Sequence, residues 1–208
     1  MNDEAELRVA WTASIGTTPD AMAAFDDLVG RHREPHRRYH DVRHVSSVVR
    51  HVRWLTESEP VDDVDAVVAA AFFHDVVYDP ATGDNEGRSA ALADLVLSGL
   101  RWSQERRRRV AALVRATEYH EPSDDQGVNV LNDADLAVLG SDPAAYQAYA
   151  TAVRTEYGHV DDEGWRRGRA GVLGLLLDRQ ALYSTETARR RWESRARANI
   201  TAELATLQ

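Results

Sequence analysis

Residues 66–75 read AVVAAAFFHD, an unbroken apolar run that ends in a histidine and an aspartate. A helix that is apolar on all sides is typical of the centre of a protein. The acidic residues just before this run suit a helix N-terminus. A charge at the end of a buried helix is costly unless it is paired or binds a metal. The stretch therefore predicts a core helix over residues 62–75 that ends at a candidate metal site, with His74 and Asp75 as donors.

The rest of the chain also has helical patterns, and the alternating pattern of strands is nearly absent. We therefore expect an all-α fold. Polar residues 121–129 predict a loop, and residues 133–139 predict a short helix that Gly140 closes. The expected helices cover residues 18–33, 39–56, 62–75, 86–97, 103–119, 133–139, 143–157, 162–179 and 185–207.

The composition limits the class of protein. The 208 residues fit one domain, which we expect to span residues 1–208 with no internal boundary. The chain has no cysteine, so thiolate metal sites and cysteine nucleophiles are excluded. All 25 basic residues are arginine, and the net charge of −9 argues against general nucleic-acid binding. Since neither a signal peptide nor a membrane-spanning run is evident, we expect a cytoplasmic location and no membrane partner.

Two further pairs of polar residues carry metal-binding chemistry. His40 and His44 are four residues apart and would share one face of a helix. Asp133 and Asp135 open the short predicted helix, where acidic residues are more often caps than ligands. Each pair alone is weak, but imidazoles and carboxylates together suit divalent ions. The combination with His74 favours a metal site.

The ordered pattern of these residues resembles the HD superfamily of metal-dependent phosphohydrolases. Residues 38–44, RYHDVRH, resemble a YHxxxH element that also occurs in cyclic-nucleotide phosphodiesterases. Residues 72–78, 84–90, 133–140 and 153–157 are similar to blocks of one bacterial branch of predicted HD phosphohydrolases. The resemblance implies an HD-type helical bundle, with a core at about residues 33–157 and N- and C-terminal helices packed on it.

The resemblance also implies roles for individual residues. It implies that His44, His74, Asp75 and Asp135 hold a divalent ion, with Asp133 as the alternative to Asp135. His40 matches the histidine that protonates a leaving oxygen. The same chemistry needs a residue that orients the attacking water, and Glu86 is a candidate, although an acid in the first turn of a helix has a structural role as well. The metal (Mn, Fe, Co, Ni, Mg or Zn) stays open.

Three further residues are candidates for binding the substrate. Arg38 and Arg154 suit phosphate contacts because guanidinium groups bind phosphate well. His120 would contact phosphate or a second metal, or it would interact with a helix dipole. The expected function is hydrolysis of a small phosphate ester, a nucleotide in the first place. The alternative is a module that binds metal and nucleotide without turnover. An apolar stripe along residues 192–207 either closes the core or forms a homodimer interface.

Overall fold

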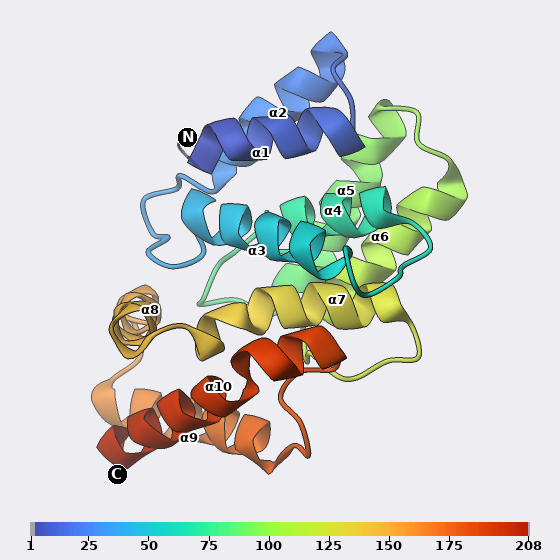
Figure 1. Ribbon diagram of the computed structural model, residues 1–208. Helices are drawn as coiled ribbons and strands as arrows, with labels where there is room; N and C mark the ends of the chain where they lie inside the picture. The colour runs from blue at the N-terminus through green and yellow to red at the C-terminus, as the bar shows by residue number, and fades with distance from the viewer. Residues whose placement is uncertain (1–2, 208) are drawn as a thin grey trace.

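The computed structural model describes residues 3–207, and these residues fold into ten α-helices and one 3-10 helix without any strand (Figure 1). The all-α prediction is confirmed. The elements in chain order are α1 (Asp3–Ser14), α2 (Pro19–Arg31), α3 (Val42–Leu55), α4 (Val64–Phe73), α5 (Asn85–Gly99), α6 (Gln104–Ala116), α7 (Gln126–Asp135), η1 (Leu136–Gly140), α8 (Pro143–Glu156), α9 (Asp162–Asp178) and α10 (Glu186–Leu207).

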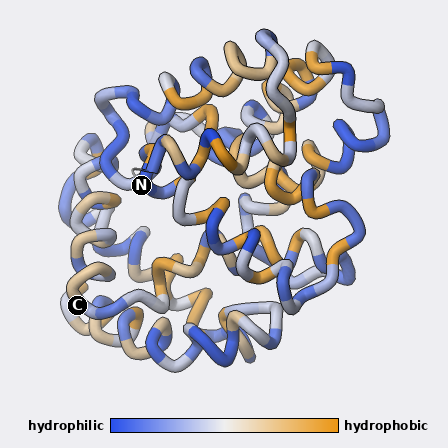
Figure 2. The backbone as a smooth tube through the Cα atoms, turned by 45° about the horizontal axis from the view of Figure 1, so that its top comes forward, coloured by the Kyte–Doolittle hydropathy of each residue, from blue (hydrophilic) through white to orange (hydrophobic). Residues whose placement is uncertain are grey.

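Helix α4 is the centre of the fold, as its sequence predicts. All its residues from Ala66 to Phe73 are buried. It packs against α1, α3, α5, α6 and α7. Asp63 caps its N-terminus by accepting a hydrogen bond from the N–H of Ala66 at 3.0 Å. In Figure 2, hydrophobic stretches run through the inner segments, whereas several peripheral loops are hydrophilic. Since α4 is enclosed in this way, its C-terminal end is fixed within the interior.

Three predicted elements differ from the structure. Residues 126–129 belong to α7 rather than to a loop, and residues 136–140 form η1, so the predicted helix 133–139 is wrong. The side chain of Asp125 caps α7 by accepting from the N–H of Gly127 at 2.9 Å. Helix α3 begins at Val42 instead of residue 39, because Asp41 accepts from the N–H groups of Arg43 and His44 and caps it there.

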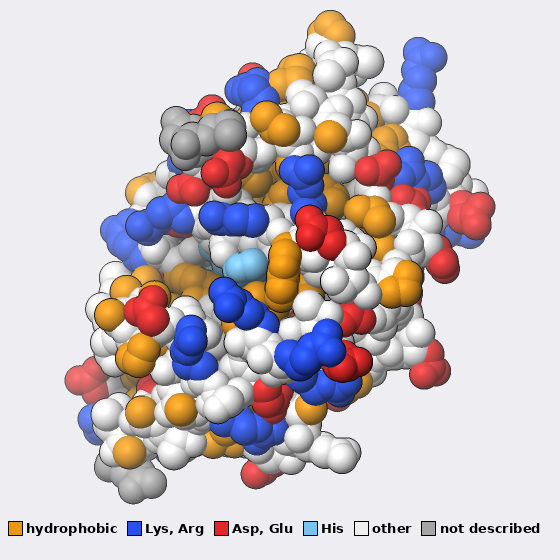
Figure 3. All heavy atoms as spheres, viewed as in Figure 1, with side chains coloured by type: hydrophobic (Ala, Val, Ile, Leu, Met, Phe, Trp, Pro, Cys, Tyr) orange, Lys and Arg blue, Asp and Glu red, His pale blue; other side chains and the backbone are white. Residues whose placement is uncertain are grey.

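The C-terminal part of the chain packs against the end of α7. Helix α10 packs on η1 and α9 (Figure 1), and its residues Trp192, Ala196 and Ile200 are buried in the same core as α4. Part of the predicted apolar stripe therefore closes the core. None of the described helices is both long and apolar enough to span a membrane. In Figure 3, acidic and basic side chains are interspersed over the visible face.

Three of the four arginines at residues 106–109 on α6 pair with carboxylates. Arg106 binds Asp63 through two nitrogens at 2.7 and 2.8 Å, and Arg107 binds Asp94 at 3.0 Å. Arg109 forms an ion pair with Asp125. Because these guanidinium groups are already neutralised, the run stabilises the packing of α6 on its neighbours.

Candidate metal centre

Three helix ends bring the predicted ligands together. His44 lies in the first turn of α3, His74 and Asp75 directly follow α4, and Asp135 is the last residue of α7. Because α4 packs against both α3 and α7, these ends meet in the interior. The convergence joins distant parts of the chain. His44 and Asp135 are 91 positions apart, with α4, α5 and α6 between their helices.

Three donor atoms, from His44, His74 and Asp75, lie close enough to one another to share one ion. Nε2 of His44 lies 3.0 Å from Nε2 of His74. Oδ2 of Asp75 lies 3.3 Å from the first of these nitrogens and 3.1 Å from the second. Oδ1 of Asp135 lies 3.1 Å from Nε2 of His44. Donors at about 2 Å from a common ion are about 3 Å apart, so His44, His74 and Asp75 fit a divalent metal. Asp135 lies beside their two imidazoles, and the four residues together are called the cluster.

Hydrogen bonds behind the donors fix their orientation. Nδ1 of His74 lies 2.9 Å from the carbonyl oxygen of Ala71 and donates to it, which leaves Nε2 free to bind a metal. Oδ2 of Asp135 accepts a hydrogen bond from Nε2 of His120 at 2.8 Å. The predicted residue His120 therefore lies beside the cluster, where it holds the second oxygen of a candidate ligand.

The cluster keeps its carboxylates ionised. Burial alone would raise the pKa of Asp75 and Asp135, but the nearby imidazoles outweigh it and hold both pKa values well below the usual range. Burial lowers the pKa of His74, yet the charges of the same two carboxylates outweigh it and raise that pKa well above its usual value. The ionised carboxylates therefore favour the binding of a cation at the cluster.

The structure brings Asp135, and not Asp133, to the cluster. Oδ1 of Asp133 accepts from the N–H of Ser184 at 2.8 Å, and its Oδ2 accepts from the N–H of Thr185 at 2.7 Å. Asp133 therefore holds the segment that leads into α10. Burial raises its pKa to about 6, in spite of these hydrogen bonds.

His40 reaches the site by a different route from the one predicted. It precedes α3, so it does not share a helix face with His44. Its ring stacks on Tyr78 with the ring centres 4.1 Å apart, and its Nδ1 lies 2.6 Å from Oε2 of Glu156. The prediction that His40 and His44 share a helix face was wrong. His40 nevertheless lies near the cluster, since the centres of the His40 and His44 rings are 5.6 Å apart.

Glu156 is a site residue that the sequence analysis missed. Its Oε1 accepts from the backbone N–H groups of residues 38, 39 and 40 at 2.6, 2.8 and 3.0 Å. Its Oε2 accepts from the Tyr78 hydroxyl at 2.9 Å. Burial would raise the pKa of Glu156, but the hydrogen bond and charge of His40 and these N–H groups outweigh it and lower the pKa to about 2. The only sequence signal was its place in the block 153–157, next to Arg154.

Arg37 is a second missed residue. Its side chain is buried, and its Nη1 donates to the carbonyl oxygens of His40 at 3.0 Å and Asp75 at 2.8 Å. Its Nη2 donates to the carbonyl oxygen of Val76 at 3.2 Å. Arg37 therefore ties the segment before α3 to the segment after α4. An arginine between His36 and Arg38, in a segment rich in basic residues, carries no sequence signal of such a role.

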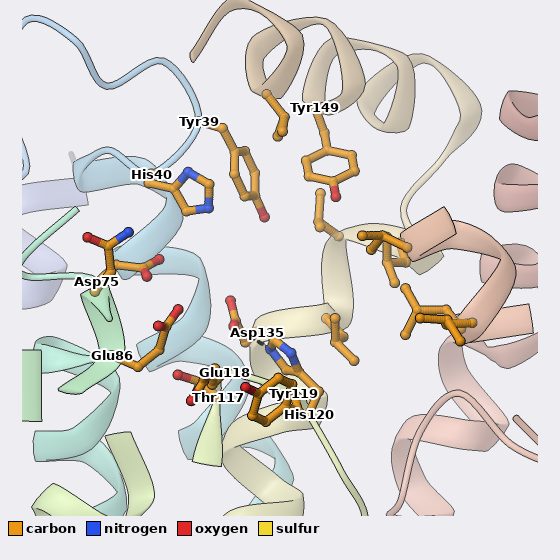
Figure 4. Close-up of a pocket in the computed structure, with 18 of the residues that line it drawn as sticks. Tyr39, His40, Asp75, Glu86, Thr117, Glu118, Tyr119, His120, Asp135 and Tyr149 are labelled. Carbon is orange, nitrogen blue, oxygen red and sulfur yellow. Dashed lines mark hydrogen bonds and ion pairs between the residues drawn. The ribbon is translucent and has the colours of Figure 1, made fainter. Parts of the chain in front are cut away.

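The cluster opens into a pocket of about 690 Å³ (Figure 4). Its lining includes the carboxylates of Asp75, Glu86, Glu118 and Asp135, together with His40 and His120. Burial, followed by the charges of Asp75 and Glu118, raises the pKa of Glu86. The lining also includes apolar and aromatic residues, among them Tyr39, Leu139, Tyr149, Val153, Val172 and Leu176.

The two arginines predicted to bind substrate do not line this pocket. Arg38 lines a separate pocket behind Tyr78, and its Nη1 donates to the carbonyl oxygen of Pro35 at 2.7 Å. Arg154 donates to the carbonyl oxygens of Tyr157 and Val160 and to Asp162, at 2.8 to 3.1 Å. Arg154 thus stabilises the connection between α8 and α9. The structure does not bring either guanidinium to the cluster.

Comparison with known proteins gives a similar solved structure. No family model matches the chain, and no curated protein matches it. The fold is similar to the crystal structure of Bacillus subtilis YpgQ in complex with ADP, with a TM-score of 0.55 and 20% sequence identity. The match covers 88% of this chain and 94% of that one. At this level of identity the match speaks for the helical fold.

Proposed function

We propose that the protein is a metal-dependent phosphohydrolase of the HD superfamily that acts on a nucleotide. The observation that carries the proposal is the group of His44, His74 and Asp75, with Asp135 beside it, at the wall of a pocket that also contains His40 and Glu86. His44, His74, Asp75 and Asp135 would hold the ion. When bound, a divalent ion supplies charge neutralisation on a phosphoryl oxygen and activates water for attack.

His40 supplies the proton for the leaving oxygen in this proposal. Its Nδ1 is bound to Glu156 at 2.6 Å, so Nε2 is the ring nitrogen that exchanges a proton with the substrate. Glu86 lines the pocket, and burial shifts its pKa upward, in the direction of neutral pH. It accepts the proton of the attacking water. Phosphoryl transfer needs mainly positioning and electrostatic stabilisation, which suits this division of roles.

The lining of the pocket supports a nucleotide as substrate. Its volume of about 690 Å³ lies within the range of small-molecule sites. The phosphate end would lie at the cluster, and the base would lie against aromatic and apolar residues of the lining such as Tyr149 and Leu176. That YpgQ was crystallised with ADP is consistent with such a ligand.

A module that binds nucleotide without turnover is the second candidate. The ADP of the YpgQ complex favours it as much as it favours an enzyme, since a bound product and a bound effector look alike. The presence of Glu86 and of a held His40 favours hydrolysis, because binding alone needs neither.

The first test is metal analysis of the purified protein with a hydrolysis panel of nucleotides and simple phosphate esters. The samples are wild type, His74→Ala and Asp75→Ala, with His159→Ala as a control because His159 is exposed and lies outside the cluster. We expect both metal and activity to be lost in the first two variants and kept in the control. Metal retained in both variants would overturn the ligand assignment. Metal lost from both variants, beside a wild type that holds metal but hydrolyses nothing, would favour the binding module.

A further inference from the structure

The cationic side chains of the pocket are already engaged. Arg169 donates to both carboxylate oxygens of Glu203 at 2.8 and 3.0 Å, and to the hydroxyl of Tyr149 at 3.1 Å. Arg179 donates to the backbone carbonyl oxygens of residues 119 and 120 at 2.7 Å each. Within the described residues that line the pocket, a phosphate group therefore meets no unpaired guanidinium.

The pocket lining is instead rich in carboxylates. They are Asp75, Glu86, Glu118, Glu121, Asp135 and Asp178. A negatively charged phosphate must therefore be neutralised at the cluster, and any further hydrogen bonds must come from neutral donors. Arginine is the residue that most often binds phosphate. Since the arginines that line the described pocket are already paired, the neutral donors to consider are hydroxyl groups.

Tyr39 carries a hydroxyl that is free to donate. Figure 4 shows its ring beside His40 and its hydroxyl pointing into the pocket. The ring is held by contacts with His40, His44 and Tyr149, with ring centres 4.9, 4.7 and 4.7 Å apart. Within residues 3–207, the hydrogen bonds of Tyr39 go through its backbone, to Glu156 and from Asp41.

Neighbouring tyrosines differ from Tyr39 in this respect. The hydroxyl of Tyr78 donates to Glu156 at 2.9 Å, and that of Tyr149 accepts from Arg169 at 3.1 Å. Both are thereby committed to the protein. The ring of Tyr39 is fixed against a candidate metal ligand, while its polar end has no protein partner in the described chain. A group that is held in place but unpaired is prepared for a ligand.

We infer that the hydroxyl of Tyr39 contacts the substrate and donates a hydrogen bond to a phosphoryl oxygen of a nucleotide bound at the cluster. The inference rests on the proposed function for the position of the phosphate. A neutral donor suits this pocket because it binds the phosphoryl oxygen without adding a cation that would compete with a metal for the carboxylates. Tyr39 thus fills the role that the sequence had indicated for Arg38 and Arg154.

The test is Tyr39→Phe, which removes only the hydroxyl and keeps the ring contacts. Tyr146→Phe is the matched control, since its hydroxyl donates to Glu203 at 2.5 Å and lies outside the pocket lining. Binding of ADP is measured by calorimetry with Mn²⁺ and without it, beside metal content, melting temperature and hydrolysis. We expect Tyr39→Phe to keep its metal and melting temperature and to bind ADP roughly 10- to 100-fold more weakly in Mn²⁺. The control should change less than about threefold.

The outcomes separate this inference from the proposed function. Unchanged binding and turnover in Tyr39→Phe, beside a functional wild type, would overturn the role of Tyr39 alone. A wild type that binds ADP with Mn²⁺ but hydrolyses nothing would overturn the proposed hydrolysis, and the binding measurement would still decide on Tyr39. A wild type that binds neither ADP nor inorganic phosphate in Mn²⁺ would overturn both.

Discussion

The carboxylate of Glu156 lies 2.6 Å from Nδ1 of His40, although the two residues are 116 positions apart. The same carboxylate accepts from three consecutive backbone N–H groups at residues 38–40. One buried side chain at the end of α8 therefore fixes both the path of the segment before α3 and the tautomer of the histidine in it. The relationship explains how His40 is held at the pocket without being part of a helix.

Replacing Glu156 by glutamine should impair catalysis more than metal binding. The amide is neutral and can no longer stabilise a charged His40 ring, so we expect kcat to fall roughly 10- to 100-fold, with an unchanged metal content. The measurement is steady-state kinetics beside metal analysis. Tyr78→Phe is the comparison, because it removes a hydrogen bond to the same oxygen but leaves the bond to His40, and its loss should be smaller. A Glu156→Gln variant with the kcat of wild type would contradict the role of this pair.

The pair Asp135→Asn and Asp133→Asn separates the ligand from its neighbour. Asp135 lies 3.1 Å from Nε2 of His44, so its variant should lose the metal while staying folded. Asp133 binds the N–H groups of Ser184 and Thr185, so its variant should keep the metal and lose roughly 1–3 kcal/mol of unfolding free energy. Metal analysis and urea unfolding of both variants test this. Loss of metal from Asp133→Asn alone would reverse the assignment.

Local patterns predicted much of the fold. The run AVVAAAFF indicated α4 because a helix that is apolar on all sides is typical of the centre of a protein, and its residues are buried there. Thr18 and Ser103 cap α2 and α6 as their residue types suggest. The start of α3 was wrong because the spacing of apolar residues was followed past Asp41, whose side chain ends the pattern by capping. The error at α7 has a similar cause, since its polar first turn hides the buried Val130 and Leu131.

The part of the site that was missed depends on contacts between distant segments. His44, His74, Asp75 and Asp135 were found because their residue types are themselves the chemistry. Glu156 and Arg37 support the site through backbone groups, and any residue can supply a backbone group. Residue type alone also predicted a phosphate role for Arg154: a guanidinium suits phosphate, but the structure places this one on the carbonyl oxygens of residues 157 and 160.

The buried residue His32 predicts a loss of stability in mild acid. Burial, together with the charge of Arg37, lowers its pKa from 6.5 to about 3. Between these values the unfolded chain binds a proton on His32 and the folded chain does not. Stability is therefore fully present above pH 6.5 and falls as the pH drops, by at most about 1.4 kcal/mol per pH unit.

The measurement is urea unfolding of wild type and His32→Gln at pH 7 and pH 5. The other titrating groups, such as His51 and Asp133, are present in both proteins, so the difference between the two isolates His32. We expect wild type to lose about 2 kcal/mol more than the variant between these pH values. An equal loss in both proteins would show that His32 is protonated in the folded state.

Gly140 should tolerate no larger side chain, because α10 crosses η1 there. A Cβ atom at this position would lie 2.4 Å from Cβ and 2.9 Å from the backbone Cα of Trp192. Trp192 cannot easily move, since its ring packs against the rings of His51, Trp54 and Tyr183, with ring centres 5.1 to 5.6 Å apart. Gly140→Ala should therefore cost about 1–3 kcal/mol of unfolding free energy.

Gly174→Ala is the control for Gly140→Ala. Gly174 lies within α9, and a Cβ there meets nothing within 4 Å. Alanine has the higher helix propensity, so this variant should gain up to about 1 kcal/mol. Opposite signs for the two substitutions in urea unfolding would establish that the close contact of α10 with η1 exists in solution. A Gly140→Ala variant as stable as wild type would mean that α10 packs differently on η1. The segment at Ser184 and Thr185, which Asp133 holds, would then be placed differently as well.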